Sequence, residues 1–234
     1  MNRDDTVLCQ RMRDIASVRI RYGFRRICNL LKREGWQDNH KRIFRLYCQE
    51  GLNLRSKRPK RNKSAAHRLE RPHMRRMHQL WSMDFVADQI FDGRKFRALT
   101  IVDDYTRKCL AIHVGQSIKG EEVSMIVQRV CLENCAFPER IQVDNGSEFI
   151  SRALDKWGYD NKVKLDFRPG KPTDTPFTGS FNGSFRDECL NTNWFLSLED
   201  AQDKIIHWKT EYNTFQPNSY LNDLTPDELN SYQK

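Results

Sequence analysis

WSMDFVADQIFDGRKFRALTIVDDYTRKCLAIHVG, residues 81–115, contains three consecutive runs rich in β-branched, aromatic and aliphatic side chains. The segment FDGR separates the first run from the second, and a turn near Thr106 separates the second from the third. Runs of this composition that are bounded by turn residues are typical of strands, and short connections favour antiparallel neighbours. The stretch therefore predicts a three-stranded antiparallel meander.

A helix and a fourth strand follow the meander. KGEEVSMIVQRVCLENC (119–135) has three valines and Ile126 on one helical face, and FPERIQV (137–143) is a short strand. A helix between two strands implies a crossover, so the sheet must be mixed. The order strand, strand, strand, helix, strand, helix is typical of an RNase H-like fold, in which the first and fourth strands lie side by side at the centre. We expect an α/β fold with a mixed five-stranded sheet flanked by helices.

Two aspartates lie where these central strands meet. Asp84 is inside the first run, and Asp144 directly follows the fourth strand at the start of DNGSEF. Each has an ordinary explanation by itself: a solvated strand-end aspartate, and a turn residue in Asp-Asn-Gly. Side by side, however, they are the hard oxygen ligands that hold magnesium ions, which activate the attacking oxygen and stabilise the leaving oxygen of a phosphodiester. The pair favours a metal-dependent phosphoryl-transfer site.

Charge divides the chain into two parts. Residues 1–80 carry 22 Lys and Arg against 7 Asp and Glu, whereas the other 154 residues carry 18 against 24, for a total net charge of +9. A basic module suits a polyanion, because neutralising phosphates releases condensed counterions. We therefore expect the N-terminal part to bind double-stranded DNA and the acidic part to hold the metal site.

The N-terminal part predicts two short helices. Apolar residues recur at helical spacing from Ile20 to Leu31, Gly35 ends this helix, and Asn39 caps the next, HKRIFRLYCQEG (40–51). Helices joined by GWQDN suggest a helix-turn-helix, although a basic helical pair without sequence-specific contacts is nearly as good an interpretation. The candidate DNA contacts, including those of the basic linker that follows, are Arg25, Arg26, Lys41, Arg42, Arg45, Lys57, Arg58, Lys60 and Arg61.

Composition excludes other classes. No apolar run approaches the length of a membrane span, and the N-terminus lacks a secretory signal, so we expect a cytoplasmic protein without membrane association. Seven cysteines without a Cys-x-x-Cys pair predict reduced thiols. We expect a helical domain at 1–53, a basic linker at 54–78, the catalytic core at 79–192 and a C-terminal helical extension at 193–234.

The chain resembles the transposases encoded by the second reading frame of bacterial two-frame insertion sequences, whose core is similar to retroviral integrases. The matching segments, in order, are RYGFRRI (21–27), NHKRIFRLYCQEGL (39–52), WSMDFV (81–86), LTIVDDYTR (99–107), VDNGSEF (143–149), RPGKPTD (168–174), SFNGSFRDECLN (180–191) and LTPDEL (224–229). The resemblance implies a transposase with two aspartates and a glutamate, which uses Mg²⁺ or Mn²⁺ to cut and join DNA ends. Asp84 and Asp144 match its first two acidic positions, and Lys171, Asn182 and Arg186 are further candidate DNA contacts.

The resemblance also implies partners. These are double-stranded DNA at the transposon ends and target, further copies of the chain assembled on DNA, and a first-reading-frame protein. The sequence begins close to the predicted helix-turn-helix, so we expect any further N-terminal segment or first-frame partner to be absent from it.

Three departures from the family pattern concern the active site and its surroundings. Gly179 occupies the position of the third acidic residue, and 34 residues separate it from Asp144 where the family usually has 35. QPNSYLND (216–223) replaces a run that is usually Arg-Pro-His-Ser. The resemblance therefore implies a transposase-like protein with a weakened metal site.

Helical spacing places position 179 on the site-facing side of its segment. In TPFTGSFNGSFRDECL (175–190) the phenylalanines share one stripe, while Gly179, Asn182 and Arg186 share the opposite side. Glycine has no side-chain oxygen, and Asp174 or Glu148 is the nearest candidate substitute. We expect impaired DNA integration, with a catalytically silent DNA-binding protein that occupies transposon ends as the alternative. A generic helix-turn-helix repressor is a weaker one, because it leaves the strand-borne aspartates without a role.

Overall fold

The computed structural model describes residues 5–54, 74–167 and 176–231. The chain divides into two compact units, Met1–Pro72 and His73–Lys234, each with its own hydrophobic core. All seven cysteines are free thiols, so the expectation of reduced cysteines is confirmed. Among the described residues, no helix is long and apolar enough to cross a membrane.

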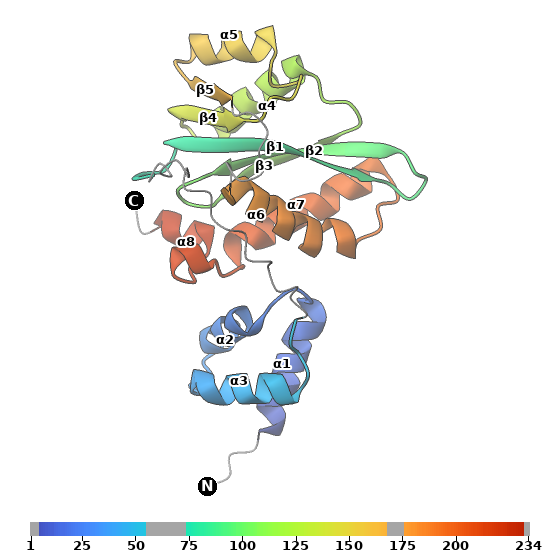
Figure 1. Cartoon of the computed structure of the whole chain (residues 1–234), viewed down its shortest axis with the longest axis vertical. Helices are drawn as coiled ribbons and strands as arrows, with labels where there is room; N and C mark the ends of the chain where they lie inside the picture. The colour runs from blue at the N-terminus through green and yellow to red at the C-terminus, as the bar shows by residue number, and fades with distance from the viewer. Residues whose placement is uncertain (1–4, 55–73, 168–175, 232–234) are drawn as a thin grey trace, which may run out of the picture. The chain divides into compact units, whose positions relative to one another are not determined.

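The N-terminal unit contains three helices, α1 (Thr6–Val18), α2 (Phe24–Arg33) and α3 (His40–Gln49) (Figure 1). Only the last two were predicted from the sequence, although Leu8, Met12 and Ile15 in α1 also have helical spacing and are buried. The expectation that Ile20 belongs to the buried stripe was wrong. It lies between α1 and α2 and is 54% exposed, because the chain turns there.

The predicted end of α2 and the predicted start of α3 are confirmed. Gly35 adopts a positive φ of 92°, and its N–H and that of Trp36 bond to the carbonyl oxygens of Lys32 and Leu31. This closes α2 in the manner that glycine favours. Asn39 caps α3 by accepting a hydrogen bond from the Lys41 N–H at 2.9 Å.

A five-stranded sheet forms the centre of the second unit, in the order β3-β2-β1-β4-β5. The strands are β1 (Leu80–Gln89), β2 (Lys95–Asp103), β3 (Cys109–Gly115), β4 (Arg140–Val143) and β5 (Lys164–Phe167). The first three are antiparallel, and β4 and β5 are parallel to β1. The predicted mixed sheet and the pairing of the first and fourth strands are confirmed, while the position of β5 was not predicted.

Helices cover both faces of the sheet (Figure 1). On one face, α4 (Gly120–Glu133) and α5 (Arg152–Asp160) pack on strand residues that include Met83. On the other, α6 (Pro176–Glu188) and α7 (Leu198–Thr214) pack on residues that include Val86. Because neighbouring strand residues point to opposite faces, Asp84 points to the α6 side.

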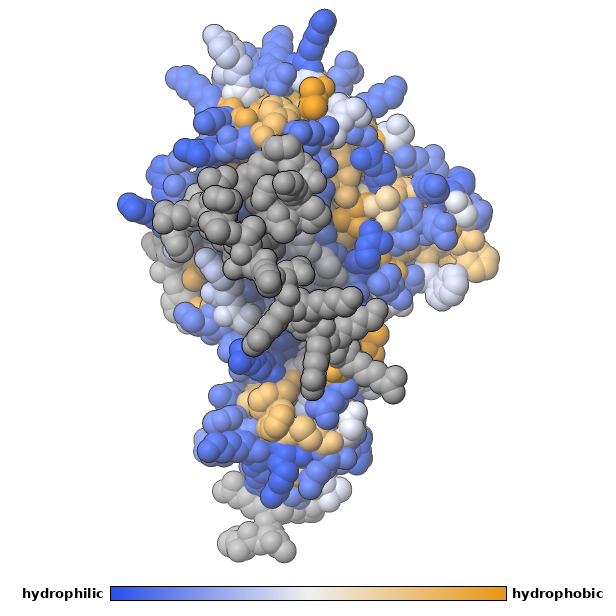
Figure 2. Space-filling model, in the orientation of Figure 1, coloured by the Kyte–Doolittle hydropathy of each residue, from blue (hydrophilic) through white to orange (hydrophobic). Residues whose placement is uncertain are grey.

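Short elements follow α6 and α7. The 3₁₀ turns η1 (Leu190–Thr192) and η2 (Ser219–Leu221) follow these two helices, and α8 (Pro226–Ser231) is the last described element. Hydrophilic residues cover most of the described surface drawn in Figure 2, with apolar residues in smaller groups.

Candidate active site

Asp84 is half-buried in the middle of β1, and both of its carboxylate oxygens are engaged. Oδ1 accepts a hydrogen bond from the Phe85 N–H at 2.8 Å, and Oδ2 accepts one from Asn182 Nδ2 at 2.7 Å. Burial raises the pKa of Asp84, and the negative charge of Asp144 raises it further. The side chain is thus a desolvated carboxylate, and a nearby cation would stabilise its charged form.

Asp144 follows β4 directly beside Asp84. The parallel register pairs Leu80 with Arg140 and Ser82 with Gln142, and the same register continued by two residues aligns the two aspartates. Asp144 is exposed, and its Oδ1 accepts a hydrogen bond from the Gly146 N–H at 2.9 Å. The predicted neighbourhood of the two aspartates on parallel central strands is therefore confirmed.

The loop after Asp144 is held at two points. Phe149 is completely buried, and Glu148 is paired with Arg97, a β2 residue whose guanidinium carbon lies 4.0 Å from the Phe85 ring centroid. Arg97 lowers the pKa of Glu148. Glu148, a candidate substitute for the third metal ligand, is thus paired with the Arg97 guanidinium.

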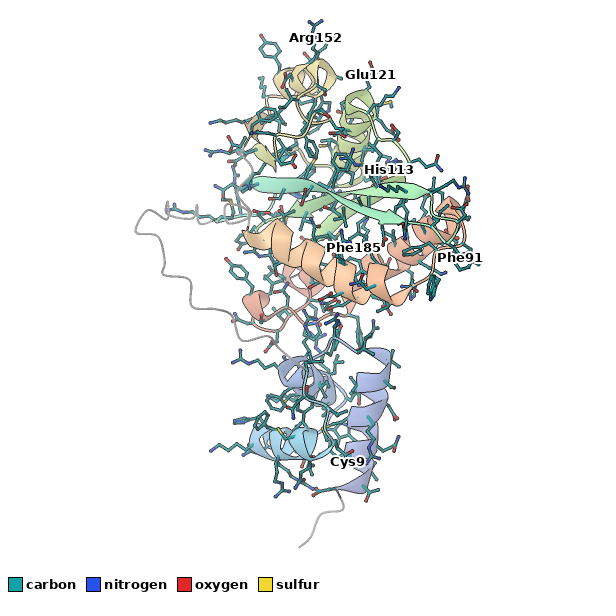
Figure 3. All side chains as sticks on the ribbon, turned by 45° about the vertical axis from the view of Figure 1, so that its right-hand side comes forward. Cys9, Phe91, His113, Glu121, Arg152 and Phe185 are labelled. Carbon is teal, nitrogen blue, oxygen red and sulfur yellow. The ribbon has the colours of Figure 1, made fainter. Side chains whose placement is uncertain are left out.

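Position 179 lies in the first turn of α6, on the face of the helix that reaches Asp84. Asn182, three residues later, donates to Asp84, while Phe181 and Phe185 are buried on the other side, as predicted. Figure 3 labels Phe185 on α6. A Cβ built on Gly179 meets nothing within 4 Å. The space at this position is open, and glycine supplies no oxygen to it.

The residues present fit a divalent cation only in part. Carboxylate oxygens suit Mg²⁺, and Asp84 and Asp144, which are close enough for the charge of one to raise the pKa of the other, provide two such groups. Within the described ranges, no group of three His, Cys, Asp or Glu side chains could hold a metal ion. Asp174 lies outside those ranges.

The candidate DNA contacts of the first unit differ in their surroundings. Arg25 and Lys41 are exposed, and Arg26 stacks on the Tyr22 ring at 5.0 Å. The expectation that Arg42 is free for DNA was wrong, because its guanidinium pairs with both Asp5 and Asp38.

The remaining candidate contacts divide in the same way. Arg45 lies 3.6 Å from a carboxylate oxygen of Asp5 but remains 61% exposed. Asn182 bonds to Asp84 rather than facing outward, and the exposed Arg186 donates to the Ala87 carbonyl oxygen at 3.3 Å. The other five candidates, Lys57, Arg58, Lys60, Arg61 and Lys171, lie outside the described residues.

Two residues near the site were missed. Thr100 is completely buried opposite Asp84, with its hydroxyl 3.1 Å from the Asp84 carbonyl oxygen and 3.3 Å from Asn182 Oδ1. Thr100 lies opposite Asp84 in the hairpin of β1 and β2, so the predicted strand pairing could have identified it. Arg97 gave no such signal, because its partner Glu148 is 51 residues away in sequence.

The comparisons with known proteins agree with this geometry. Models described as "Integrase core domain" match residues 74–172 and 162–226, and one described as "HTH-like domain" matches residues 3–61. The chain is 41% identical, over 97% of its length and 81% of the relative's, to the insertion element IS407 uncharacterized 31.7 kDa protein of Burkholderia multivorans. It is 24% identical, over 89% of its length and 77% of the relative's, to the putative transposase InsK for insertion sequence element IS150 of Escherichia coli.

A solved structure shares the fold. The simian T-cell lymphotropic virus intasome in complex with a PP2A regulatory subunit contains a chain with a TM-score of 0.58 and 14% identity, over 82% of this chain and 67% of that one. Together with the mixed sheet and the adjacent aspartates, the matches identify the family. The chain belongs to the insertion-element transposases that combine an HTH-like domain with an integrase core.

Proposed function

We propose that this chain is a transposase whose metal-dependent cutting and joining of DNA is impaired at position 179. The observation that carries this proposal is the open space around Gly179, one helical turn from the Asn182 side chain that bonds to Asp84. A glutamate at this position would face the two aspartates. Glycine leaves the site with two of the three carboxylates that the family pattern contains.

Asp84 and Asp144 would hold Mg²⁺ or Mn²⁺. When bound, the metal supplies activation of the attacking oxygen and stabilisation of the leaving oxygen of a phosphodiester. Asn182 fixes the Asp84 carboxylate through its 2.7 Å bond, and the Arg97–Glu148 pair holds the loop that begins at Asp144. A single missing carboxylate weakens the metal site, and we expect the rate to fall by several orders of magnitude.

The N-terminal unit would bind double-stranded DNA at transposon ends and target. Its excess of Lys and Arg supports this, as does the match to an HTH-like domain. Arg25 and Lys41 are its best exposed contacts, whereas Arg42 has a structural role. We propose that copies of the chain assemble on DNA in the bacterial cytoplasm, with a first-reading-frame protein as a further partner.

The same open position favours a second candidate function. A chain that binds transposon ends but cannot cut them would occupy those ends and inhibit active copies. DNA binding would be unaffected by Gly179, because the basic helices lie in the other compact unit. The two candidates differ only in whether the site catalyses.

The test is Mg²⁺-dependent cleavage and strand transfer by the chain as given and by three variants. Gly179→Glu restores the carboxylate, Gly179→Gln adds the same bulk without charge, and Asp84→Asn removes a proposed ligand. We expect weak activity from the given chain, a gain only with glutamate, and none with Asp84→Asn. Full Mg²⁺-dependent activity of the given chain that Asp84→Asn abolishes would refute the impairment. Absence of any activity, with DNA binding intact, would support the silent inhibitor.

A further inference from the structure

The Arg107 side chain lies between two aromatic rings from distant parts of the chain. Its guanidinium carbon is 3.9 Å from the ring centroid of Phe177 and 3.9 Å from that of Tyr220. Phe177 belongs to the first turn of α6, and Tyr220 belongs to η2. One planar cation thus joins the start of α6 to the C-terminal segment.

Stacking, rather than an ion pair, holds this guanidinium. Arg107 Nε is buried and has no hydrogen-bond partner, and none of the ion pairs found among the described residues includes Arg107. An arginine over an aromatic face contributes about 0.5–1 kcal/mol at an exposed site and more when it is desolvated. A planar guanidinium can stack on both rings at once, which a lysine ammonium cannot.

The backbone that carries Arg107 is fixed to the sheet. Asp103, at the end of β2, accepts hydrogen bonds from the N–H groups of Tyr105 and Thr106 and from the Thr106 hydroxyl. The Arg107 N–H bonds to the Asp103 carbonyl oxygen, and the Tyr212 hydroxyl donates to the Arg107 carbonyl oxygen at 3.2 Å. The guanidinium therefore projects from a rigid turn.

The first turn of α6 depends more than the later turns on a stabilising contact such as the one between Phe177 and Arg107. Phe181 and Phe185 anchor the later turns in the core. Gly179 and Gly183 each weaken the helix by roughly 1 kcal/mol relative to alanine, and Phe177 is the aromatic anchor before them. The contact of Phe177 with Arg107 lies two residues from position 179.

Tyr220 lies in QPNSYLND (216–223), the segment that departs from the family pattern. Asn218 shapes this segment by accepting a hydrogen bond from the Tyr220 N–H at 3.0 Å, and its own N–H bonds to the Leu224 carbonyl oxygen. Tyr220 remains 67% exposed, so the ring is held over Arg107 without being part of the core. Among the described residues, the Arg107 guanidinium that contacts this exposed ring also contacts Phe177 of α6.

We propose that Arg107 is a positioning residue, clamped by Phe177 and Tyr220, that orders the first turn of α6 and so places the side chain at position 179 against the two aspartates. This inference rests on the proposed function, because it takes position 179 as the place of a metal ligand. It gives the C-terminal segment a role in the active site although none of its residues is among the proposed metal ligands.

The experiment measures Mn²⁺ affinity by electron paramagnetic resonance in the full chain carrying Gly179→Glu. Tyr220→Leu removes the outer ring, Tyr220→Phe retains it, and Arg107→Lys keeps the charge but not the plane. Tyr159→Leu is the matched control, because Tyr159 is an 86% exposed tyrosine on α5. Hydrogen exchange of residues 176–181 is followed in the same proteins.

We expect Tyr220→Leu and Arg107→Lys to weaken Mn²⁺ binding roughly two- to fivefold, which is the range that one cation–π contact supports, and to speed exchange in the first turn of α6. Tyr220→Phe and Tyr159→Leu should match the parent. Unchanged Mn²⁺ affinity with Tyr220→Leu in a Gly179→Glu chain that does bind Mn²⁺ would overturn the inference.

Failure of the proposed function would look different. In that case Gly179→Glu would bind Mn²⁺ no better than the chain as given. The clamp would then be judged by hydrogen exchange alone: faster exchange at residues 176–181 with Tyr220→Leu, but not with Tyr220→Phe, supports it, and equal exchange rejects it.

Discussion

Substituting Gly179 by alanine, glutamine and glutamate separates helix stability from charge at the site. Gly179 is not among the described glycines with positive φ, and an added Cβ meets nothing within 4 Å, so alanine fits without strain. Alanine stabilises a helix interior by about 1 kcal/mol relative to glycine. In a domain of this size the gain corresponds to a rise of roughly 2–4 °C in melting temperature.

Glutamine and glutamate have nearly the same size and helix propensity, but only glutamate adds a charge. Position 179 lies on the face of Asn182, whose Nδ2 is 2.7 Å from Asp84 Oδ2, so a carboxylate there is repelled by the two aspartates. In the presence of a chelator, the glutamate variant should therefore melt below the glutamine variant. Mg²⁺ should reverse this order, because a bound ion at about 100 times its dissociation constant stabilises the native state by roughly 2.7 kcal/mol.

Differential scanning calorimetry of the four chains, in chelator and in excess Mg²⁺, measures both effects. The alanine variant is the control, since its gain over glycine should not depend on Mg²⁺. Two results would refute the reasoning. A destabilising alanine would mean that the backbone at 179 is not an ordinary open helical position, and identical Mg²⁺ responses of glutamate and glutamine would mean that position 179 does not face the aspartates.

Three further predictions concern the charged groups around the site and in the N-terminal unit. Burial and Asp144 raise the pKa of Asp84, so ionisation of this carboxyl lowers the stability of the fold above its unfolded pKa. Asp84→Asn should therefore raise the melting temperature at pH 7, and this gain should fade below about pH 4. A lower melting temperature of the variant at pH 7 would contradict the prediction. Lys41→Gln should weaken duplex DNA binding and reduce the slope of log affinity against log salt concentration by about 0.9. Arg42→Gln should chiefly lower the stability of the fold, because it removes the partner of Asp5 and Asp38. Salt titrations of DNA binding and thermal melts of both variants distinguish the two effects. Arg97 lowers the pKa of Glu148, so this pair stabilises the fold above the unfolded pKa of Glu148 and not in acid. A double-mutant cycle of Arg97→Gln and Glu148→Gln should give a coupling energy of at most about 1 kcal/mol at pH 7. Coupling that persists at pH 3 would disprove this account of the pair.

Local features of this protein were predictable because their causes lie within a few residues. The three strands of the meander follow from their side-chain pattern, the end of α2 at Gly35 from backbone freedom, and the start of α3 at Asn39 from a capping side chain. The stripe of Phe181 and Phe185 likewise follows from helical spacing. The order of the predicted helices and strands also indicated the topology, since a helix between two strands of one sheet permits few arrangements.

The partners of charged and polar side chains required the tertiary structure. Arg42 was expected to face DNA, but Asp5, 37 residues earlier, pairs with it. Asn182 reaches Asp84 across 98 residues, and Arg107 meets Phe177 and Tyr220 from two different elements. Periodicity determines which face of a helix or strand is buried, but a salt bridge or stacked ring depends on which surfaces meet when the chain folds. The two aspartates were identifiable by residue type, whereas the open space at Gly179 and the clamp that holds its helical turn exist only once α6 lies on the sheet.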